Sequence, residues 1–169
     1  MRYKGAILFI ILAVGLFFVF LSQREKVDQP KRAIEGLEVP EFSLVGADGK
    51  TYNIGDLKGK TVFIHFWAAW CKECKKELPS IYALYKRKKD DPGFVFISVA
   101  WREDPVKTKK YLKEQNMDIP VYIDPDQRAA RIFGVTGVPE TYIINPEGVL
   151  QKRVIGPGKW ETFQVLSDQ

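Results

Sequence analysis

Cysteine and histidine, the usual ligands of structural zinc, are scarce in this chain. Among 169 residues there are only two cysteines, Cys71 and Cys74, and a single histidine, His65. A structural zinc site needs four protein ligands, usually cysteine or histidine, and these residue types do not supply four. We therefore expect no metal site. A copper site made by the cysteine pair and His65 stays open as an alternative, although His65 lies in an apolar segment six residues before the pair.

The sequence also lacks internal repeats, low-complexity segments and a strong excess of one charge. It is 46% hydrophobic and 28% charged, with a net charge of +5, which is typical of a globular domain. The densest basic run, residues 86–89, stops at Asp90 and Asp91. Such a run is typical of the C-terminal end of a helix, where cations offset the helix dipole. We expect no nucleic-acid partner.

Residues 6–21 are uncharged and apolar and follow Arg2 and Lys4. With one small residue added at each end the run reaches 18 residues, about 27 Å of helix against a hydrocarbon core of about 30 Å. The run ends in FVFLSQRE, which lacks the small-residue pattern of a signal-peptidase site. We predict an uncleaved signal anchor, with the N-terminus inside and the domain outside. A cleaved signal peptide is the alternative.

The chain divides into three parts on this interpretation. Residues 1–22 form the anchor, and the polar residues 23–37 form a linker. Residues 38–169 form one domain, which is long enough to bury a core of its own.

The domain alternates apolar strand patterns with helical ones. The run TVFIHFW (61–67) is nearly continuously apolar, as in a strand covered on both faces, and FVFISVAW (94–101) is a second buried strand. This alternation predicts a three-layer α/β fold with a parallel core sheet and an antiparallel hairpin at its edge. The remaining predicted strands are two short ones around a turn at 47–50, one over 120–124 and a hairpin over 140–156. Helices are predicted over 71–88, 104–116, 126–135 and 159–167. Pro79 should kink the first of these helices, and Asp104 should cap the second.

Cys71 and Cys74 follow the first apolar strand and open the helix after it. A disulfide across so short a loop would stabilise the fold by only about 2 kcal/mol. The unpaired N–H groups of a helix N-terminus stabilise a thiolate, and residues three apart share a helix face. The spacing therefore favours a redox pair in which Cys71 attacks and Cys74 resolves the mixed disulfide. We expect no cofactor besides this redox-active disulfide.

Two motifs are similar to those of a known superfamily. The segment FWAAWCKECKKELP (66–79) resembles the active site of thioredoxin-like proteins, and GVPETYIINPEG (137–148) resembles their cis-proline loop and hairpin. From about Glu41 onward the domain resembles the membrane-tethered thiol–disulfide oxidoreductases of the TlpA, ResA and CcmG (DsbE) type. The resemblance implies a thioredoxin-like fold with an N-terminal β-hairpin extension and a central α/β insertion, preceded by one transmembrane helix. It also implies a bacterial cytoplasmic membrane, with the domain on the periplasmic or other extracytoplasmic side.

The resemblance further implies the activity, the partners and roles for single residues. Proteins of this branch reduce extracytoplasmic protein disulfides, such as those of apocytochrome c during cytochrome c maturation, with electrons from a membrane donor of the CcdA or DsbD type. Pro139 would be the cis-proline, and the backbone of Val138 would pair with an extended substrate. Glu77 matches an acidic residue near the active site, Glu140 would select substrate or act as a second acid, and Trp70 would pack beside the first cysteine.

The sequence departs from the family pattern at two places. His65 stands where thioredoxin has a buried acid, so it would lie near Cys74, either as a neutral base or as a core residue. Between the cysteines, Lys72 and Glu73 replace the usual pair that ends in proline, which leaves the reduction potential open.

Two related functions fit the residues less well. A thiol peroxidase would carry proline and threonine or serine at the places of Ile64 and Ala68. A copper-delivery protein would space its cysteines by three residues and use a distant downstream histidine, which this chain lacks.

Overall fold

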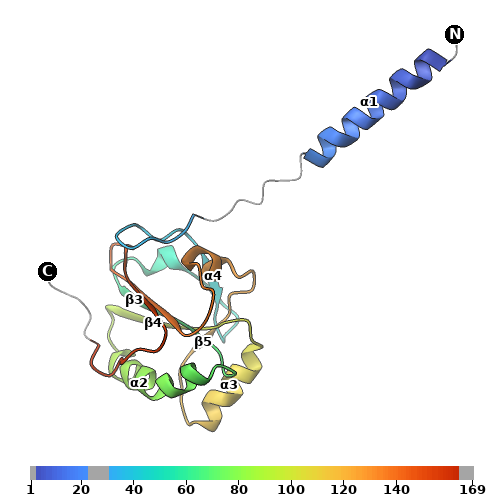
Figure 1. Cartoon of the computed structure of the whole chain (residues 1–169). Coiled ribbons are helices and arrows are strands. Elements are labelled where there is room, and N and C mark those ends of the chain that lie inside the picture. The colour runs from blue at the N-terminus through green and yellow to red at the C-terminus, as the bar shows by residue number, and fades with distance from the viewer. Residues whose placement is uncertain (1–2, 23–30, 164–169) are drawn as a thin grey trace.

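A computed structural model of the protein describes residues 3–22 and 31–163. Twelve elements follow one another along these residues (Figure 1): α1 (Tyr3–Ser22), β1 (Ser43–Val45), β2 (Thr51–Asn53), the 3-10 helix η1 (Ile54–Leu57), β3 (Thr61–Trp67), α2 (Lys72–Lys88), β4 (Phe94–Ala100), α3 (Pro105–Glu114), β5 (Val121–Tyr122), α4 (Arg128–Phe133), β6 (Glu140–Ile144) and β7 (Leu150–Ile155).

A mixed five-stranded sheet forms the middle layer of the domain, in the order β5-β4-β3-β6-β7. Strands β3, β4 and β5 run parallel, while β6 is antiparallel to both β3 and β7. The predicted parallel core is therefore confirmed. The predicted antiparallel hairpin at the edge is also confirmed, because β6 pairs antiparallel with β3 and β7 is the last strand of the sheet.

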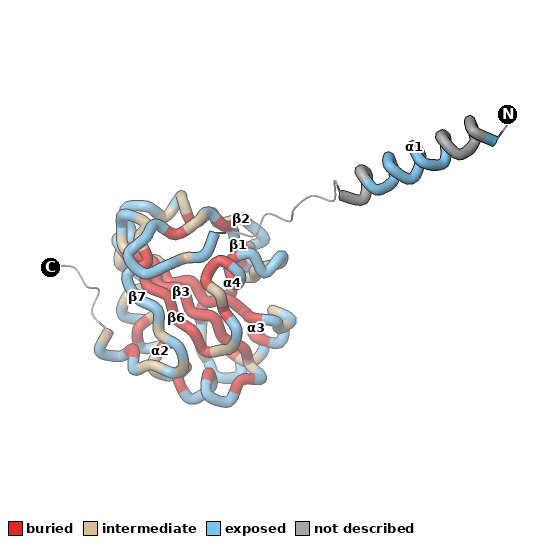
Figure 2. Tube along the Cα trace, turned by 45° about the horizontal axis from the view of Figure 1, so that its top comes forward, coloured by how far each residue is buried: buried red, intermediate tan, exposed pale blue. Residues whose placement is uncertain are grey.

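The two faces of the sheet carry separate cores, as the three-layer prediction requires. On β3, Val62, Ile64 and Phe66 belong to one core, and Phe63 and Trp67 belong to the other. Helices α2 and α3 cover the second face, and α4 with the β1–β2 hairpin covers the first (Figure 1). Every residue of β3 is buried, and the buried trace in Figure 2 follows the central strands. A strand covered on both faces has no polar side, which explains its continuous apolar sequence.

The N-terminal hairpin and the α/β insertion lie where the resemblance implies them. Strands β1 and β2 form their own antiparallel pair around a turn in which Gly46 N–H donates to the Lys50 carbonyl. Helix α3 and strand β5 lie between β4 and α4 in the chain, and β5 is an edge strand of the main sheet. The predicted N-cap of α3 is confirmed, since the Asp104 side chain accepts the N–H of Val106 at 2.9 Å.

The N-terminal part of the chain departs from the predicted boundaries. Within residues 3–22 and 31–163, no helix is found that has both the length and the apolar character to cross a membrane. Of the predicted linker, residues 23–30 lie outside the described residues. Residues 33–37 belong to the domain: Ala33 N–H donates to the Ile132 carbonyl at 2.8 Å, and Leu150 N–H donates to the Leu37 carbonyl at 3.0 Å.

The predicted last helix, over 159–167, does not form in the part that is described. Residues 161–162 make a turn, and residues 164–167 lie outside the described range. Trp160 explains the difference, because its backbone N–H donates to Ser80 Oγ at 2.5 Å and its ring packs edge-on against Phe63. These contacts hold the segment around Trp160 against α2 and the sheet.

Candidate active site

Cys71 lies where the buried strand β3 has ended and α2 begins. Cys71 is the N-cap residue of α2, and its sulfur accepts the backbone N–H of Cys74 at 3.1 Å. Cys71 and Cys74 form a disulfide with a Cα–Cα separation of 5.3 Å, inside the ordinary range for such bonds. The structure thus brings the two cysteines together as the spacing predicts, with the positive end of the helix dipole at Cys71.

The two sulfurs differ in their access to solvent. Cys71 is 7% exposed and Cys74 is 0% exposed, and both belong to the core between α2 and the sheet. Between them, Lys72 and Glu73 point outward, and Glu73 pairs with Lys76 at 2.8 Å. Of the two cysteines, Cys71 is therefore the one with exposed surface.

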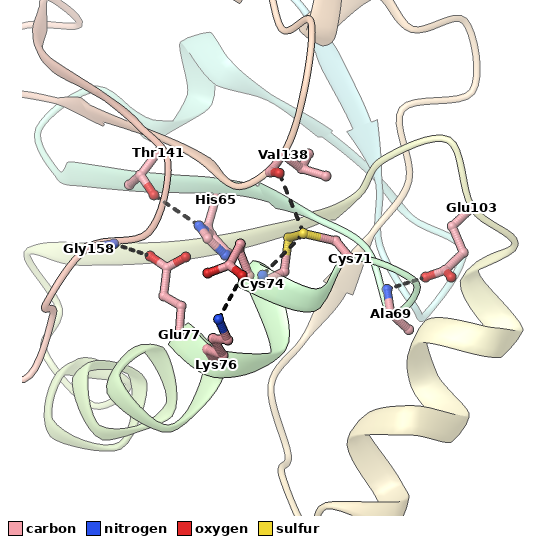
Figure 3. The surroundings of a disulfide bond; sticks show 11 residues. His65, Ala69, Cys71, Cys74, Lys76, Glu77, Glu103, Val138, Thr141 and Gly158 are labelled. Atoms are coloured by element: carbon pink, nitrogen blue, oxygen red, sulfur yellow. Dashed lines mark hydrogen bonds and ion pairs between the residues drawn. A yellow bond between two sulfur atoms is a disulfide. The ribbon is translucent and has the colours of Figure 1, made fainter.

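The loop before β6 lies against the disulfide. The Val138–Pro139 peptide bond is cis, as the motif predicts. The carbonyl oxygen of Val138 lies 3.5 Å from the sulfur of Cys71 (Figure 3). Val138 is half-buried and Pro139 is buried, so backbone and not a charged side chain borders the reactive sulfur.

Glu77 is buried beneath the site, only 3% exposed. Its Oε1 accepts N–H bonds from the Gly158 backbone at 3.0 Å and from the Trp160 indole, while no described residue pairs with its Oε2. Burial raises the pKa of this carboxyl, and the two N–H donors oppose the rise. Glu77 lies three residues after Cys74 on the same helix face. Its carboxyl, which holds a proton more readily than an exposed carboxyl does, therefore lies on the side of the buried sulfur.

His65 is fully buried in β3, and its Nδ1 lies 2.9 Å from the hydroxyl oxygen of Thr141. No described residue pairs with its Nε2. A buried N–H without an acceptor is rarer than an unpaired lone pair, so this geometry favours a proton on Nδ1, donated to Thr141. Burial lowers the His65 pKa to about 3, and the ring is therefore neutral at physiological pH. In Figure 3, His65 and Glu77 are drawn on the Cys74 side of the disulfide.

Glu140 differs from the expectation of a residue that contacts substrate. It is 2% exposed, and its carboxylate pairs with Arg153 at 2.9 Å and accepts the Tyr142 hydroxyl at 2.5 Å. The Thr136 N–H also donates to it, at 3.4 Å. The carboxylate is thus engaged inside the domain, where it ties β6 and β7 to the start of the loop that carries Val138.

Trp70 lies at the surface, directly before Cys71 in the chain. Its ring is 58% exposed, and its closest aromatic partner is Trp101, at 6.2 Å between ring centroids. Trp101 is buried at the end of β4. The two rings form an apolar border beside Cys71.

Two contacts at the site could not be predicted from motif spacing. Glu103 accepts the N–H of Ala69 at 2.8 Å and the hydroxyl of Thr108 at 2.6 Å (Figure 3 shows the first). It thereby fixes the turn that leads into Cys71. Trp160, far along the chain, holds Glu77. Neither residue carries a local signal, since each acts through a fold-dependent contact.

The described residues 3–22 and 31–163 contain no group of three or more His, Cys, Asp or Glu side chains placed to hold a metal ion. The site contains the partly accessible sulfur of Cys71 at a helix N-terminus, the buried sulfur of Cys74 bonded to it, and the buried carboxyl of Glu77. This arrangement can pass two electrons by thiol–disulfide exchange.

Comparisons with known proteins agree with this geometry. The AhpC/TSA family model matches residues 36–153. The chain is 33% identical to thiol-disulfide oxidoreductase ResA of Bacillus subtilis (strain 168) over 90% of this chain and 82% of that protein. A thiol:disulfide interchange protein of the thioredoxin family from Chlorobium tepidum TLS superposes with a TM-score of 0.61 at 30% identity, covering 77% of this chain and 88% of that one. The fold is also that of StoA from Bacillus subtilis, with a TM-score of 0.62 at 24% identity over 73% and 92% of the two chains.

Proposed function

The chain belongs to the AhpC/TSA family and to its thioredoxin-like thiol–disulfide oxidoreductases of the ResA type, and we propose that it reduces protein disulfides outside the cytoplasm. The observation that carries this proposal is the unequal cysteine pair. Cys71 lies at the N-terminus of α2 and is partly accessible, while Cys74 is buried behind it. Such a pair suits attack by one sulfur and resolution by the other.

The exchange proceeds in two balanced steps. The thiolate of reduced Cys71 attacks one sulfur of a substrate disulfide, which forms a mixed disulfide and releases the other substrate sulfur as a thiolate that takes up a proton. Cys74 then loses its proton and attacks the sulfur of Cys71. The substrate's second sulfur leaves, the substrate gains two electrons, and the Cys71–Cys74 disulfide remains, which is the state of the structure.

The second step needs an acceptor for the Cys74 proton in a dry environment, and two buried groups compete for this role. Protonating His65 means placing a charge where burial has lowered its pKa from 6.5 to about 3, a penalty of about 5 kcal/mol. Burial moves the pKa of Glu77 upward, toward that of a thiol. The carboxyl of Glu77 is therefore the better proton acceptor, and we assign His65 to the core beneath the pair.

The substrate approaches the border formed by the loop before β6 and the exposed Trp70. The Val138 carbonyl lies at the reactive sulfur, so an extended substrate strand that pairs with the backbone there would bring its disulfide to Cys71. Backbone pairing suits substrates that differ in sequence. In line with the ResA-type relatives, we propose apocytochrome c among them and a membrane donor of the CcdA or DsbD type as the source of electrons.

We also propose that the chain is anchored in a bacterial cytoplasmic membrane by its N-terminal residues, with the domain on the outer side. This proposal rests on the uncharged run at 6–21 and on Arg2 and Lys4 before it. In intact bacteria that produce the full chain, a membrane-impermeant maleimide should label Cys71 after mild reduction. Labelling that requires cell lysis would place the domain inside and contradict this part of the proposal.

The activity itself is tested with the reduced full chain in detergent and a protein substrate that has one disulfide. We expect one substrate disulfide reduced per chain, no reaction with Cys71→Ser, and a stable mixed disulfide with Cys74→Ser. A Cys71→Ser variant as active as the wild type would refute the exchange. In cells, loss of the chain should lower covalently bound haem in c-type cytochromes, and an unchanged level would remove apocytochrome c from the substrates.

A further inference from the structure

A hollow of about 170 Å³ lies beside the active site and is lined by three arginines. Arg102 follows β4, Arg131 lies in the last turn of α4, and Arg32 comes from the segment before β1. The guanidinium of Arg32 lies over the end of α4, where a side chain added at Gly134 would come within 2.8 Å of its Nη1. The polar residues Gln127 and Thr136 complete the wall.

The three arginines of this hollow make no ion pair with a carboxylate of residues 31–163. Among residues 31–163, no carboxylate oxygen lies within 4.0 Å of the three guanidinium groups. Asp124 is the acidic residue whose charge interacts with Arg131, but its two oxygens already accept the N–H groups of Ala129 and Ala130. All three arginines are exposed. The hollow thus presents three cations to solvent and no anion of its own.

Two residues of the wall hold unusual backbone conformations. Arg102 has a φ of 49° and Gln127 a φ of 51°, in the left-handed region that residues other than glycine seldom adopt. Their side chains meet, with Arg102 Nε donating to Gln127 Oε1 at 3.4 Å. The Arg102 guanidinium also lies 4.6 Å above the Trp101 ring. These contacts hold Arg102 in place at the rim of the hollow. Left-handed backbone conformations in residues other than glycine cost free energy and cluster at functional sites.

Two segments of the chain connect the hollow to the reactive sulfur of Cys71. Thr136 lines the hollow, and Val138, two residues on, touches the sulfur of Cys71 with its carbonyl; two residues span at most about 7 Å. On the other side, Arg102 follows Trp101, whose ring neighbours Trp70 next to Cys71. A chain bound at the sulfur therefore reaches the hollow within a few residues.

We propose that this hollow binds acidic side chains of the substrate, so that the protein prefers disulfides with aspartate or glutamate two to four residues from the attacked cysteine. The inference rests on the proposed function and names its substrate class. Guanidinium groups pair with carboxylates at short range and draw acidic chains toward the site from a distance. Because the arginines are exposed, this attraction weakens as salt concentration rises.

The test uses three peptides of equal length, each carrying one cysteine in a mixed disulfide with thionitrobenzoate. One has glutamates two and three residues from the cysteine, the second has the same glutamates eight and nine residues away, and the third has glutamines throughout. The reduced full chain releases the coloured thiol, so the rate of each reaction is read directly. We compare the wild type, Arg102→Gln/Arg131→Gln, and the matched control Lys60→Gln/Lys89→Gln, whose changes lie before β3 and after α2, at the opposite ends of these elements from Cys71.

We expect the near-glutamate peptide to react about three to ten times faster than the others at low salt, with the advantage lost at 1 M salt. The arginine variant should lose this advantage but reduce the glutamine peptide at the wild-type rate, and the lysine control should keep it. Equal rates for near and distant glutamates, or equal loss in the control, would overturn the inference while the activity stands. If no peptide is reduced, both this inference and the proposed function are refuted.

Discussion

Replacing Glu77 by glutamine tests how the buried cysteine loses its proton. The amide oxygen of glutamine can keep the two N–H bonds that Gly158 and Trp160 donate. The substitution therefore preserves the local packing and removes the titratable group. Glu77→Gln should leave the attack by Cys71 unchanged and slow the resolving step, in which Cys74 attacks Cys71.

The size of the effect follows from the position of the carboxyl. Cys74 and Glu77 are three residues apart on α2, with their Cβ atoms about 5–6 Å apart, within reach of a direct or water-bridged proton transfer. Positioned acid–base groups contribute about 10² to 10⁴ in rate. Since water can replace part of this contribution, we expect resolution to slow by about ten- to a hundredfold.

The assay mixes reduced protein with a disulfide substrate, quenches with acid at set times and measures the mixed disulfide by mass spectrometry. The mixed disulfide should accumulate in Glu77→Gln and not in the wild type. Glu73→Gln is the matched control, because Glu73 carries the same charge on the same helix but is exposed and paired with Lys76. Equal resolution rates in all three proteins would refute the role of Glu77.

The buried groups around the site lead to two further predictions. His65→Asn should leave the pH profile of exchange unchanged between pH 5 and 9, because the pKa of about 3 keeps the ring neutral there. The unfolded chain binds a proton at His65 below about pH 6.5 and the folded chain does not. The wild type should therefore lose stability relative to His65→Asn as pH falls from 6.5 toward 4, by up to about 1.4 kcal/mol per pH unit in urea unfolding; parallel curves would contradict this. Arg153→Gln leaves the buried Glu140 without its cation and should lower the free energy of unfolding by about 3 kcal/mol, whereas the exposed neighbour Lys152→Gln should change it by less than about 0.5 kcal/mol.

The elements around the cysteine pair were the most predictable from sequence. The run at 61–67 matches β3 residue for residue, because a short, nearly continuous apolar run is typical of a strand covered on both faces. Cys71 as the N-cap of α2 follows from the switch between strand and helix patterns. Here the local pattern and the tertiary environment specify the same structure, so spacing alone was sufficient.

The orientation of single side chains was less predictable, because it depends on contacts between distant segments. Glu140 resembles an exposed site residue in sequence, yet Arg153 and Tyr142 hold it in the interior. The segment around Trp160 has a helical pattern, but contacts with Ser80 and Glu77 hold it in a turn. Tertiary contacts overrode the local propensity in both cases. The cluster of Arg32, Arg102 and Arg131 forms only when three separate segments meet.

Thiol–disulfide exchange by this protein depends most directly on the ionisation of Cys71 in the reduced state. The helix dipole and the Cys74 N–H favour the thiolate, and the nearby Val138 carbonyl opposes it. The helix N-terminus is expected to prevail and to lower the pKa of the Cys71 thiol below the 8.5 of a free cysteine. The measurement is the rate of alkylation of Cys71 by iodoacetamide against pH, with the modified residue identified by mass spectrometry. A midpoint below pH 8.5 is expected, and a midpoint at or above 8.5 would contradict the mechanism.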